Sequence, residues 1–210
     1  MDVQELKNII EAAILAAGEP VSLERLQGLF EEDERPAPED FRAALAALGE
    51  DCATRGIELV EVGSGWRFQS RKELVPWISR LWEEKPPRYS RAFLETLALI
   101  AYRQPITRAE IEDIRGVAVG TNIVKSLTER GWVRVVGHRD VPGKPALYAT
   151  TRAFLDYFNL KGLDDLPTLA ELRDIDKLEA ELDLGEHVPA SNDAEAPALP
   201  AADVEPIELC

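Results

Sequence analysis

The residues able to catalyse a reaction or bind a metal are few in this 210-residue sequence, and they lack the neighbours that such chemistry needs. The histidines are His138 and His187, and the cysteines are Cys52 and Cys210. A nucleophilic site combines a serine or cysteine with a histidine base, and a structural zinc site needs closely spaced cysteine or histidine ligands. No such set and no CxxC pair accompanies these residues. We therefore predict neither an enzyme nor a metal site.

The segment RGVAVGTN, residues 115–122, has two glycines four residues apart, which raises the question of phosphate binding. A phosphate-binding loop requires the pattern GxxxxGK[ST], because its lysine and backbone N–H groups hold the phosphates. Here the second glycine is followed by Thr121 and not by lysine. The glycines fit a loop and the start of a helix, so no cofactor is predicted.

The net charge of −15 is distributed unevenly along the chain. Residues 1–85 contain 10 basic and 18 acidic side chains, residues 86–162 contain 12 and 7, and residues 163–210 contain 2 and 14. The three net charges are therefore −8, +5 and −12. Segments of such different charge are expected to have different roles.

The sequence shows no sign of a membrane protein or a secreted protein. No apolar run approaches the roughly 18 residues of a membrane span. The start MDVQELKNII lacks the basic and apolar blocks of a signal peptide. We therefore expect a soluble cytoplasmic protein that does not bind membranes.

One sequence motif occurs twice, 85 residues apart: AAGEPVSLERLQGL at residues 16–29 aligns with AYRQPITRAEIEDI at residues 101–114. An amphipathic helix pattern precedes each proline, which disfavours helical geometry in the residue before it. Ser22 and Thr107, two positions after the prolines, are suited to cap the next helix, and Thr107 forms a capping box with Glu110. Each copy therefore predicts two helices joined by a turn.

A third helix pattern follows in each copy, at residues 39–53 and about 120–130. The apolar period then changes from 3.6 to 2, in IELVEVGSGWRFQS and in WVRVVGHRDVPGKPALYATT, which predicts a β-hairpin. Three helices followed by a hairpin is the winged-helix arrangement. We predict a mainly α fold with small β-hairpin wings (α+β), as two tandem winged-helix domains plus an acidic C-terminal tail.

The predicted boundaries follow these patterns and the change in composition. Residues 74–82 are predicted to form an extra helix after the first hairpin, and EEKPPR contains a stiff Pro-Pro pair. The parts are a first winged-helix domain at 1–82, a linker at 83–88, a second winged-helix domain at 89–162, a marginal acidic helix at 163–184 and a disordered tail at 185–210.

The run RYSRAFLETLALIAYRQPITRAEIEDIRGV, residues 88–117, closely resembles the signature of the bacterial segregation and condensation protein B family, ScpB. RGW at residues 130–132, the PGKP wing and the LYATT segment continue the resemblance in order. Two departures are the GHR of residues 137–139 and Lys144, where the family has Gly-Arg and Pro-Gly-Arg-Pro. A lysine cannot make the bidentate contact that an arginine makes.

The resemblance implies a non-enzymatic accessory subunit of a condensin-like SMC–ScpA–ScpB complex. Such a subunit acts in chromosome condensation and partition during cell division, at the nucleoid. The first domain would form a homodimer, and the second would bind the kleisin ScpA and, through it, the SMC ATPase.

Three groups of residues are candidates for contacts with partners, and each has an alternative role. The repeated motif offers a surface for a partner. Tyr102 is equally suited to cap the core, and the arginines are equally suited to pair with local carboxylates. The basic side chains near the second hairpin are candidates for contact with the DNA backbone or a partner, or form a solvated face. Apolar residues of the first helix cover more than one face, so some are candidates for a dimer interface. The groups are Tyr102, Arg103, Arg108 and Arg115; Lys125, Arg134, Arg139 and Lys144; and Ile9, Ile10, Ile14 and Leu15.

The alternative function is a winged-helix DNA-binding transcriptional regulator. A recognition helix needs cations for the phosphates, but the third helix of the first copy exposes mainly Glu39, Asp40, Glu50 and Asp51. The second copy fits weak or indirect DNA association only. We also expect the acidic tail to screen the basic second domain.

Overall fold

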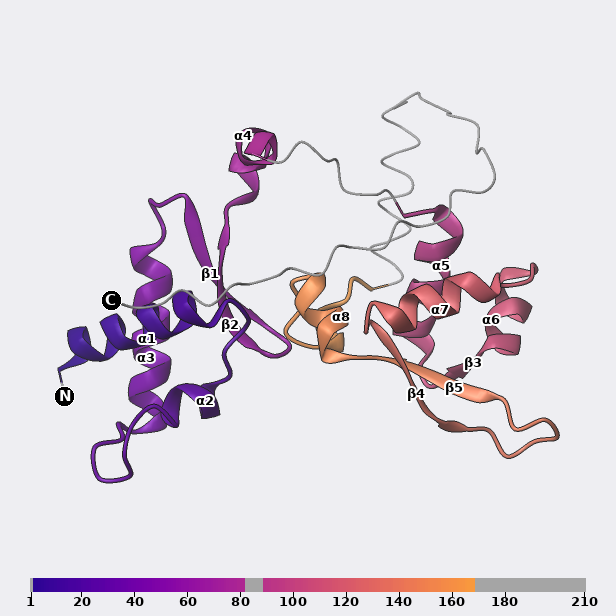
Figure 1. Cartoon of the computed structure of the whole chain (residues 1–210), viewed down its shortest axis with the longest axis horizontal. Coiled ribbons are helices and arrows are strands. Elements are labelled where there is room, and N and C mark those ends of the chain that lie inside the picture. The colour runs from indigo at the N-terminus through magenta and orange to yellow at the C-terminus, as the bar shows by residue number, and fades with distance from the viewer. Residues whose placement is uncertain (1, 82–88, 169–210) are drawn as a thin grey trace, which may run out of the picture. The chain divides into compact units, whose positions relative to one another are not determined.

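The computed structural model describes residues 2–81 and 89–168 (Figure 1). Helices and small antiparallel sheets alternate, which confirms the α+β class. The predicted linker at 83–88, most of the acidic helix at 163–184 and the tail at 185–210 lie outside the described residues, so the domain boundaries stay predictions. Over the described ranges, no helix combines the length and apolar character needed to cross a membrane.

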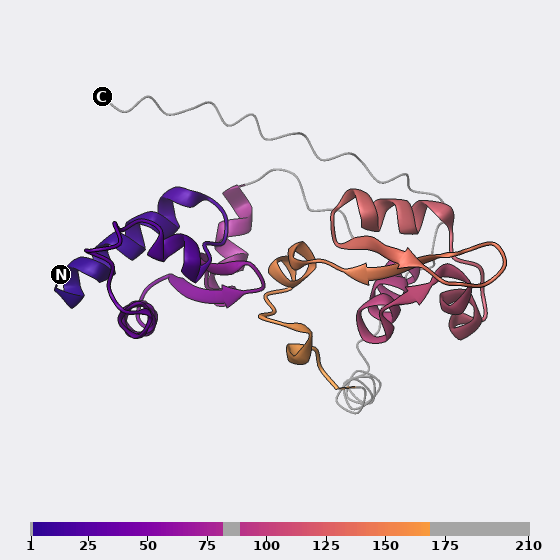
Figure 2. The same ribbon diagram turned by 90° about the horizontal axis from the view of Figure 1, so that it is seen from below.

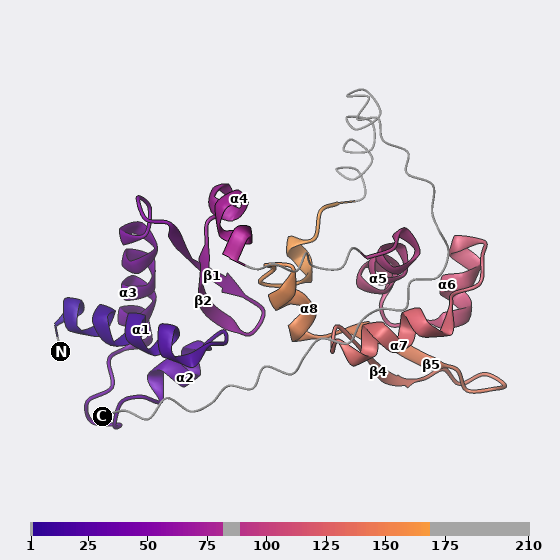
Figure 3. The same cartoon turned by 45° about the horizontal axis from the view of Figure 1, so that its top comes forward.

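The N-terminal half is built from three helices and a two-stranded hairpin. Helix α1 ends where Gly18 takes the left-handed conformation (φ 65°), and Ser22 Oγ accepts a hydrogen bond from the backbone N–H of Arg25 (3.2 Å), which caps α2. Figure 3 shows α1 lying across α3. The elements are α1 (Val3–Ala17), α2 (Leu23–Gln27), α3 (Pro38–Asp51), β1 (Ile57–Val62) and β2 (Gly65–Ser70).

Apolar residues of these helices and of the hairpin form the core of this half. Ile10, Leu26 and Phe41 are fully buried in it. Lys7 of α1 forms an ion pair with Asp51 at the end of α3, which adds a charged contact beside this core.

The turn of the first hairpin depends on one glycine. Gly65 has φ 140°, and a Cβ atom there would lie 2.2 Å from the carbonyl oxygen of Val21. This close approach allows the antiparallel bridge in which Val21 and Trp66 exchange two backbone hydrogen bonds of 2.8 Å. The hairpin is thereby attached to the turn between α1 and α2.

The helix expected at residues 74–82 is broken. The segment consists of a 3-10 turn at Lys72–Leu74, the four-residue helix α4 (Val75–Ile78) and a second 3-10 turn at Ser79–Leu81. Pro76 lies in the first turn of α4 and lacks the backbone donor that a longer helix would use. The prediction of one continuous helix was wrong.

The second half repeats the order of three helices and a hairpin, with an additional strand, β3, and a further helix, α8. The sheet order is β3-β5-β4, all antiparallel. Figure 2 shows the loop between β4 and β5 projecting beyond the helices of this half. The elements are α5 (Arg91–Arg103), β3 (Ile106–Thr107), α6 (Arg108–Arg115), α7 (Thr121–Glu129), β4 (Val133–His138), β5 (Ala146–Thr150) and α8 (Arg152–Tyr157), followed by a 3-10 turn at Leu163–Asp165.

The predicted capping box of the second half is present. Thr107 Oγ1 accepts a hydrogen bond from the backbone N–H of Glu110 (3.3 Å), and Glu110 Oε2 accepts one from the backbone N–H of Thr107 (2.9 Å). The core beneath it includes Ile100, Ile111 and Leu127, all fully buried. In both halves the helix that follows the proline begins at a hydroxyl cap, at Ser22 and at Thr107.

Candidate functional site

Arg108, in the second copy of the repeated motif, binds the loop between α6 and α7 of its own chain. Its Nε lies 3.0 Å from Oε1 of Glu112, and its Nη2 donates to the carbonyl oxygen of Val119 at 2.5 Å. The backbone N–H of Val119 donates to the same Glu112 oxygen (2.9 Å). That bond and then the Arg108 guanidinium lower the pKa of Glu112. Arg108 therefore fixes the loop between α6 and α7, in agreement with the local pairing considered from the sequence.

Arg115 joins two helices of the second half. Its Nη2 lies 3.2 Å from Oε2 of Glu95 on α5, and only 10% of its side chain is exposed. Glu95 also accepts a hydrogen bond from Arg91 Nε at 2.8 Å, and this bond and the one from Arg115 lower the pKa of Glu95. The partner of Arg115 is thus on another helix and not at helical spacing.

Tyr102 and Arg103 lie in the last turn of α5. Tyr102 is half-buried, and Arg103 is exposed. Within residues 2–81 and 89–168, Arg103 has neither a hydrogen bond nor an ion pair. Of the four residues predicted for a partner surface, Arg103 is the one whose charged group is free.

The basic residues near the second hairpin are in three different settings. Lys125 Nζ lies 3.6 Å from Glu129 on α7, and Arg139 Nη2 lies 3.1 Å from Glu110. Lys144 has a positive φ of 38° in the projecting loop and lines a cavity of about 530 Å³ with His138, Arg139 and Asp140. The structure does not bring these residues together with Arg134.

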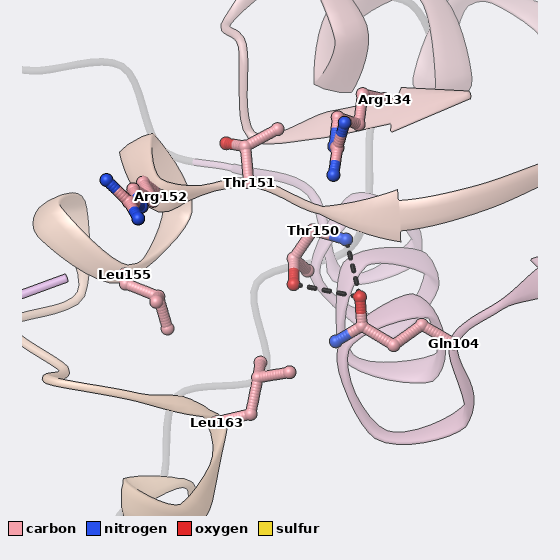
Figure 4. Close-up of a pocket in the computed structure, with 7 residues that line it drawn as sticks. All are labelled: Gln104, Arg134, Thr150, Thr151, Arg152, Leu155 and Leu163. Carbon is pink, nitrogen blue, oxygen red and sulfur yellow. Dashed lines mark hydrogen bonds between the residues drawn. The ribbon is translucent and has the colours of Figure 1, made fainter. Parts of the chain in front are cut away.

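Arg134 lines a second pocket, which the sequence did not reveal (Figure 4). Its volume is about 400 Å³. Its lining side chains come from β4, β5, α8, the 3-10 turn at Leu163–Asp165 and the residues next to them, including Gln104 directly after α5. The lining residues are Gln104, Arg134, Thr150, Thr151, Arg152, Leu155 and Leu163.

The uncharged polar groups of this pocket are already engaged. Gln104 Oε1 accepts hydrogen bonds from the backbone N–H (2.7 Å) and from Oγ1 (3.0 Å) of Thr150, and Gln104 Nε2 donates to the carbonyl oxygen of Ala101 (3.1 Å). Thr151 Oγ1 donates to the carbonyl oxygen of Gly131. The guanidinium groups therefore remain as the donors available to a ligand.

An aromatic cluster surrounds Trp132 on the same half of the chain. Arg130 lies over the ring of Tyr89, 5.0 Å from its centroid, and over that of Trp132 at 5.6 Å. Tyr157 is 53% exposed, and its hydroxyl lies 3.3 Å from that of Tyr89, a hydrogen bond that raises the pKa of Tyr157. Tyr157 and Phe158 present aromatic surface to solvent that sequence reasoning did not single out.

Two of the four residues predicted for a dimer interface belong to the core instead. Ile10 and Ile14 are buried among the helices of the N-terminal half, so their side chains are not available to a partner. Their spacing of four places both on the buried face of α1. Ile9 is half-buried and Leu15 is 59% exposed, so these two remain candidates.

Within the described ranges, the histidine and the cysteine lie in different elements of the fold. Cys52 is a buried free thiol, and His138 is exposed in the second hairpin. No group of three His, Cys, Asp or Glu side chains within residues 2–81 and 89–168 has the geometry of a metal site.

Comparisons with known proteins all indicate the same family. The family described as "Segregation and condensation complex subunit ScpB" matches residues 8–169. A segregation and condensation protein B homolog of Coxiella burnetii is 53% identical over 201 residues, which cover 94% of this chain and 96% of that protein. Segregation and condensation protein B of Bacillus subtilis is 40% identical over 187 residues, which cover 88% and 92%.

Two solved structures are also similar in sequence. ScpB from Mycobacterium tuberculosis is 34% identical and covers 76% of this chain and 98% of its own, with a TM-score of 0.35. A dimer of an ScpB N-terminal domain complexed with an ScpA peptide is 29% identical and covers 38% and 98%, also with a TM-score of 0.35. The family membership rests on the sequence matches and not on these superpositions.

Proposed function

The chain belongs to the family of the segregation and condensation complex subunit ScpB, and we propose on that basis that it is a non-enzymatic accessory subunit of a condensin-like complex. Its role is chromosome condensation and partition during cell division, in the cytoplasm at the nucleoid. The single observation that carries this proposal is the 53% identity that extends over both halves of the chain.

Both halves are proposed to be winged-helix domains, at residues 1–82 and 89–162. The order α1, α2, α3, β1, β2 in the first half corresponds to α5, α6, α7, β4, β5 in the second. In each half the second helix starts at a hydroxyl cap two residues after a proline. This correspondence, together with the 85-residue repeat, supports a duplicated scaffold.

The first domain is proposed to form the homodimer through α1. Leu15 exposes 59% of its surface, while Ile10 and Ile14 of the same helix are buried in the core. Exposed apolar residues on a helix whose other face is buried are typical of an interaction surface.

The second domain is proposed to bind the kleisin ScpA, which in turn connects to the SMC ATPase. Arg103 at the end of α5 has a free guanidinium, whereas Arg108 and Arg115 are engaged in internal ion pairs. We therefore assign the contact to Tyr102 and Arg103, with Arg108 and Arg115 supporting the surface from inside.

This assignment is tested by capture of ScpA from a cell lysate on the tagged full-length chain. Arg103→Glu is expected to reduce the ScpA retained, because it reverses the free charge of the surface. Arg91→Glu makes the same change of charge at the exposed start of α5 and is the matched control. Equal retention of ScpA by both variants contradicts the role of Arg103.

The DNA-binding regulator remains the second candidate because the second hairpin exposes cationic side chains. Arg134 and Lys144 are both exposed, which fits weak contact with phosphates. A DNA titration at rising salt is expected to show weak binding that falls steeply with salt concentration. Tight, sequence-preferring binding at physiological salt favours the regulator instead.

A further inference from the structure

The pocket of Figure 4 is lined by two arginines, Arg134 of β4 and Arg152 of α8. Neither forms a hydrogen bond or an ion pair within residues 2–81 and 89–168; Arg152 acts only at longer range, on the carboxylate of Glu24. Figure 4 shows the two side chains on opposite sides of Thr151. A guanidinium fork matches the two oxygens of a carboxylate or a phosphate. The pocket is therefore suited to an anionic ligand.

Most other arginines between residues 89 and 168 are engaged by the fold itself. Arg130 lies over the rings of Tyr89 and Trp132. Ion pairs with glutamates engage Arg91, Arg108, Arg115 and Arg139. Arg103 is free within the described ranges, but it does not line this pocket. Because the chain has 39 acidic and 24 basic side chains, two guanidinium groups left free at one pocket indicate a site for a ligand from outside.

The same pocket has apolar side chains, one of which the fold leaves largely uncovered. Leu155 of α8 packs against the core of the second half, whereas Leu163 of the following 3-10 turn is 42% exposed. A ligand that covers Leu163 removes apolar surface from water, which favours binding. A fitting occupant therefore carries an apolar group as well as a negative charge, which a bare inorganic anion does not.

We propose that this pocket binds an acidic segment of a partner protein, in which carboxylate side chains stand next to apolar ones. Clusters of arginines recognise acidic motifs in this way. The volume of about 400 Å³ lies in the usual range of ligand pockets and accommodates a few side chains. The phosphates of DNA would also match the arginines, but they offer no apolar group to Leu163. A protein segment is thus the better match.

This site is separate from the surface assigned to ScpA. Neither Tyr102 nor Arg103 lines the pocket, so the inference does not depend on that assignment. The capture of ScpA by the Arg103→Glu variant tests the ScpA surface, whereas the following experiments test the pocket. Failure of one proposal does not imply failure of the other.

The first test measures which ligand chemistry the full-length chain binds. The probe is a fluorescein-labelled peptide, Gly-Glu-Leu-Glu-Leu-Glu-Gly, and its binding is followed by fluorescence anisotropy. In two matched peptides, either the glutamates are replaced by glutamine or the leucines by serine. Each is expected to bind at least about fivefold more weakly, because the first loses its ion pairs and the second its apolar surface. Equal affinities of the three peptides overturn the proposal.

The second test measures whether the peptide binds at the pocket. Arg134→Gln with Arg152→Gln is expected to weaken binding of the glutamate-leucine peptide by about tenfold, since each exposed ion pair contributes a few-fold. Arg91→Gln with Lys125→Gln removes two exposed charges elsewhere in the same half and is expected to leave the affinity unchanged. Equal affinities of the two double variants show that the peptide does not bind there. A duplex DNA probe that loses affinity for the pocket variant while the peptide does not would assign the pocket to nucleic acid and also overturn the proposal.

The third test uses the natural chain and needs no substitution. Saturating glutamate-leucine peptide is expected to shift the amide signals of Thr150 and Thr151 and the side-chain signals of Gln104 in the two-dimensional NMR spectrum, because these residues line the pocket. The glutamine peptide at the same concentration is the matched control and is expected to leave these signals in place. Unchanged signals with the first peptide, or equal shifts with both, contradict the proposal.

Discussion

At the scale of single residues, Arg115 and Arg91 show how one carboxylate serves two different contacts. Both arginines approach Glu95, but the side chain of Arg115 is almost buried whereas that of Arg91 is 94% exposed. A buried ion pair that loses one partner is costly, and an exposed pair contributes little. The two arginines therefore differ in their importance for stability although they share a partner.

Arg115→Ala is accordingly expected to lower the free energy of unfolding by about 1–3 kcal/mol. Arg91→Ala is expected to change it by less than about 0.5 kcal/mol and is the matched control. Urea unfolding of the two variants, followed by tryptophan fluorescence, measures the difference. Equal midpoints for the two variants contradict the structural role of Arg115.

Glu110 gives a prediction of how stability depends on pH. Its pKa is lowered from 4.5, first by the hydrogen bond from the backbone of Thr107, then by that from the Thr107 hydroxyl, and also by Arg139. A carboxylate with a lowered pKa in the folded state stabilises the fold above its unfolded pKa and loses this effect as the pH falls through the folded value. Glu110→Gln is therefore expected to be less stable than the natural chain at pH 7, and the difference should shrink below about pH 4.5. Unfolding by urea at both pH values measures this, and a difference independent of pH contradicts it.

At the scale of elements, the first hairpin depends on the geometry of its turn. Gly65→Ala would place Cβ against the carbonyl of Val21 and demands a φ of 140° that other residues rarely adopt. We expect it to cost about 2 kcal/mol or more. Gly49→Ala in α3 meets no atom within 4 Å and is expected to gain up to about 1 kcal/mol, because alanine is the better helix former. Thermal unfolding compares the two, and a neutral Gly65→Ala contradicts the close approach.

The sequence predicted the elements whose signals are local. The helices around both prolines, their caps at Ser22 and Thr107 and the two hairpins follow from periodicity and from neighbours within four residues, and the structure confirms them. Strand β3 was missed because two residues, Ile106–Thr107, become a strand only by pairing with β5, some 40 residues later. Local patterns do not contain such pairings.

The candidate site was less predictable for the same reason. Arg134 was selected as a basic residue on an exposed strand, but its pocket requires Gln104, Arg152 and Leu163, which come from separate elements. Likewise, the apolar pattern of α1 did not distinguish the core residues Ile10 and Ile14 from the exposed Leu15. That assignment depends on where α3 packs against α1.

At the scale of the whole molecule, the two halves of the chain differ in net charge and in the partner that each is proposed to contact. The acidic first half carries the proposed dimer surface, and the basic second half carries the proposed surface for ScpA. Leu15→Glu is expected to convert the dimer into a monomer, because a carboxylate within an apolar interface loses its hydration. Leu94→Glu places the same change on an exposed residue of α5 and should leave the dimer intact. Sedimentation velocity distinguishes the two, and a dimeric Leu15→Glu chain contradicts the proposed surface.

The measurement that tests the central proposal most directly is the mass, by multi-angle light scattering, of the full-length chain co-purified with its own ScpA. The account predicts a complex that contains two copies of the 23.3 kDa chain together with ScpA. A 23.3 kDa monomer that elutes free of ScpA would contradict it.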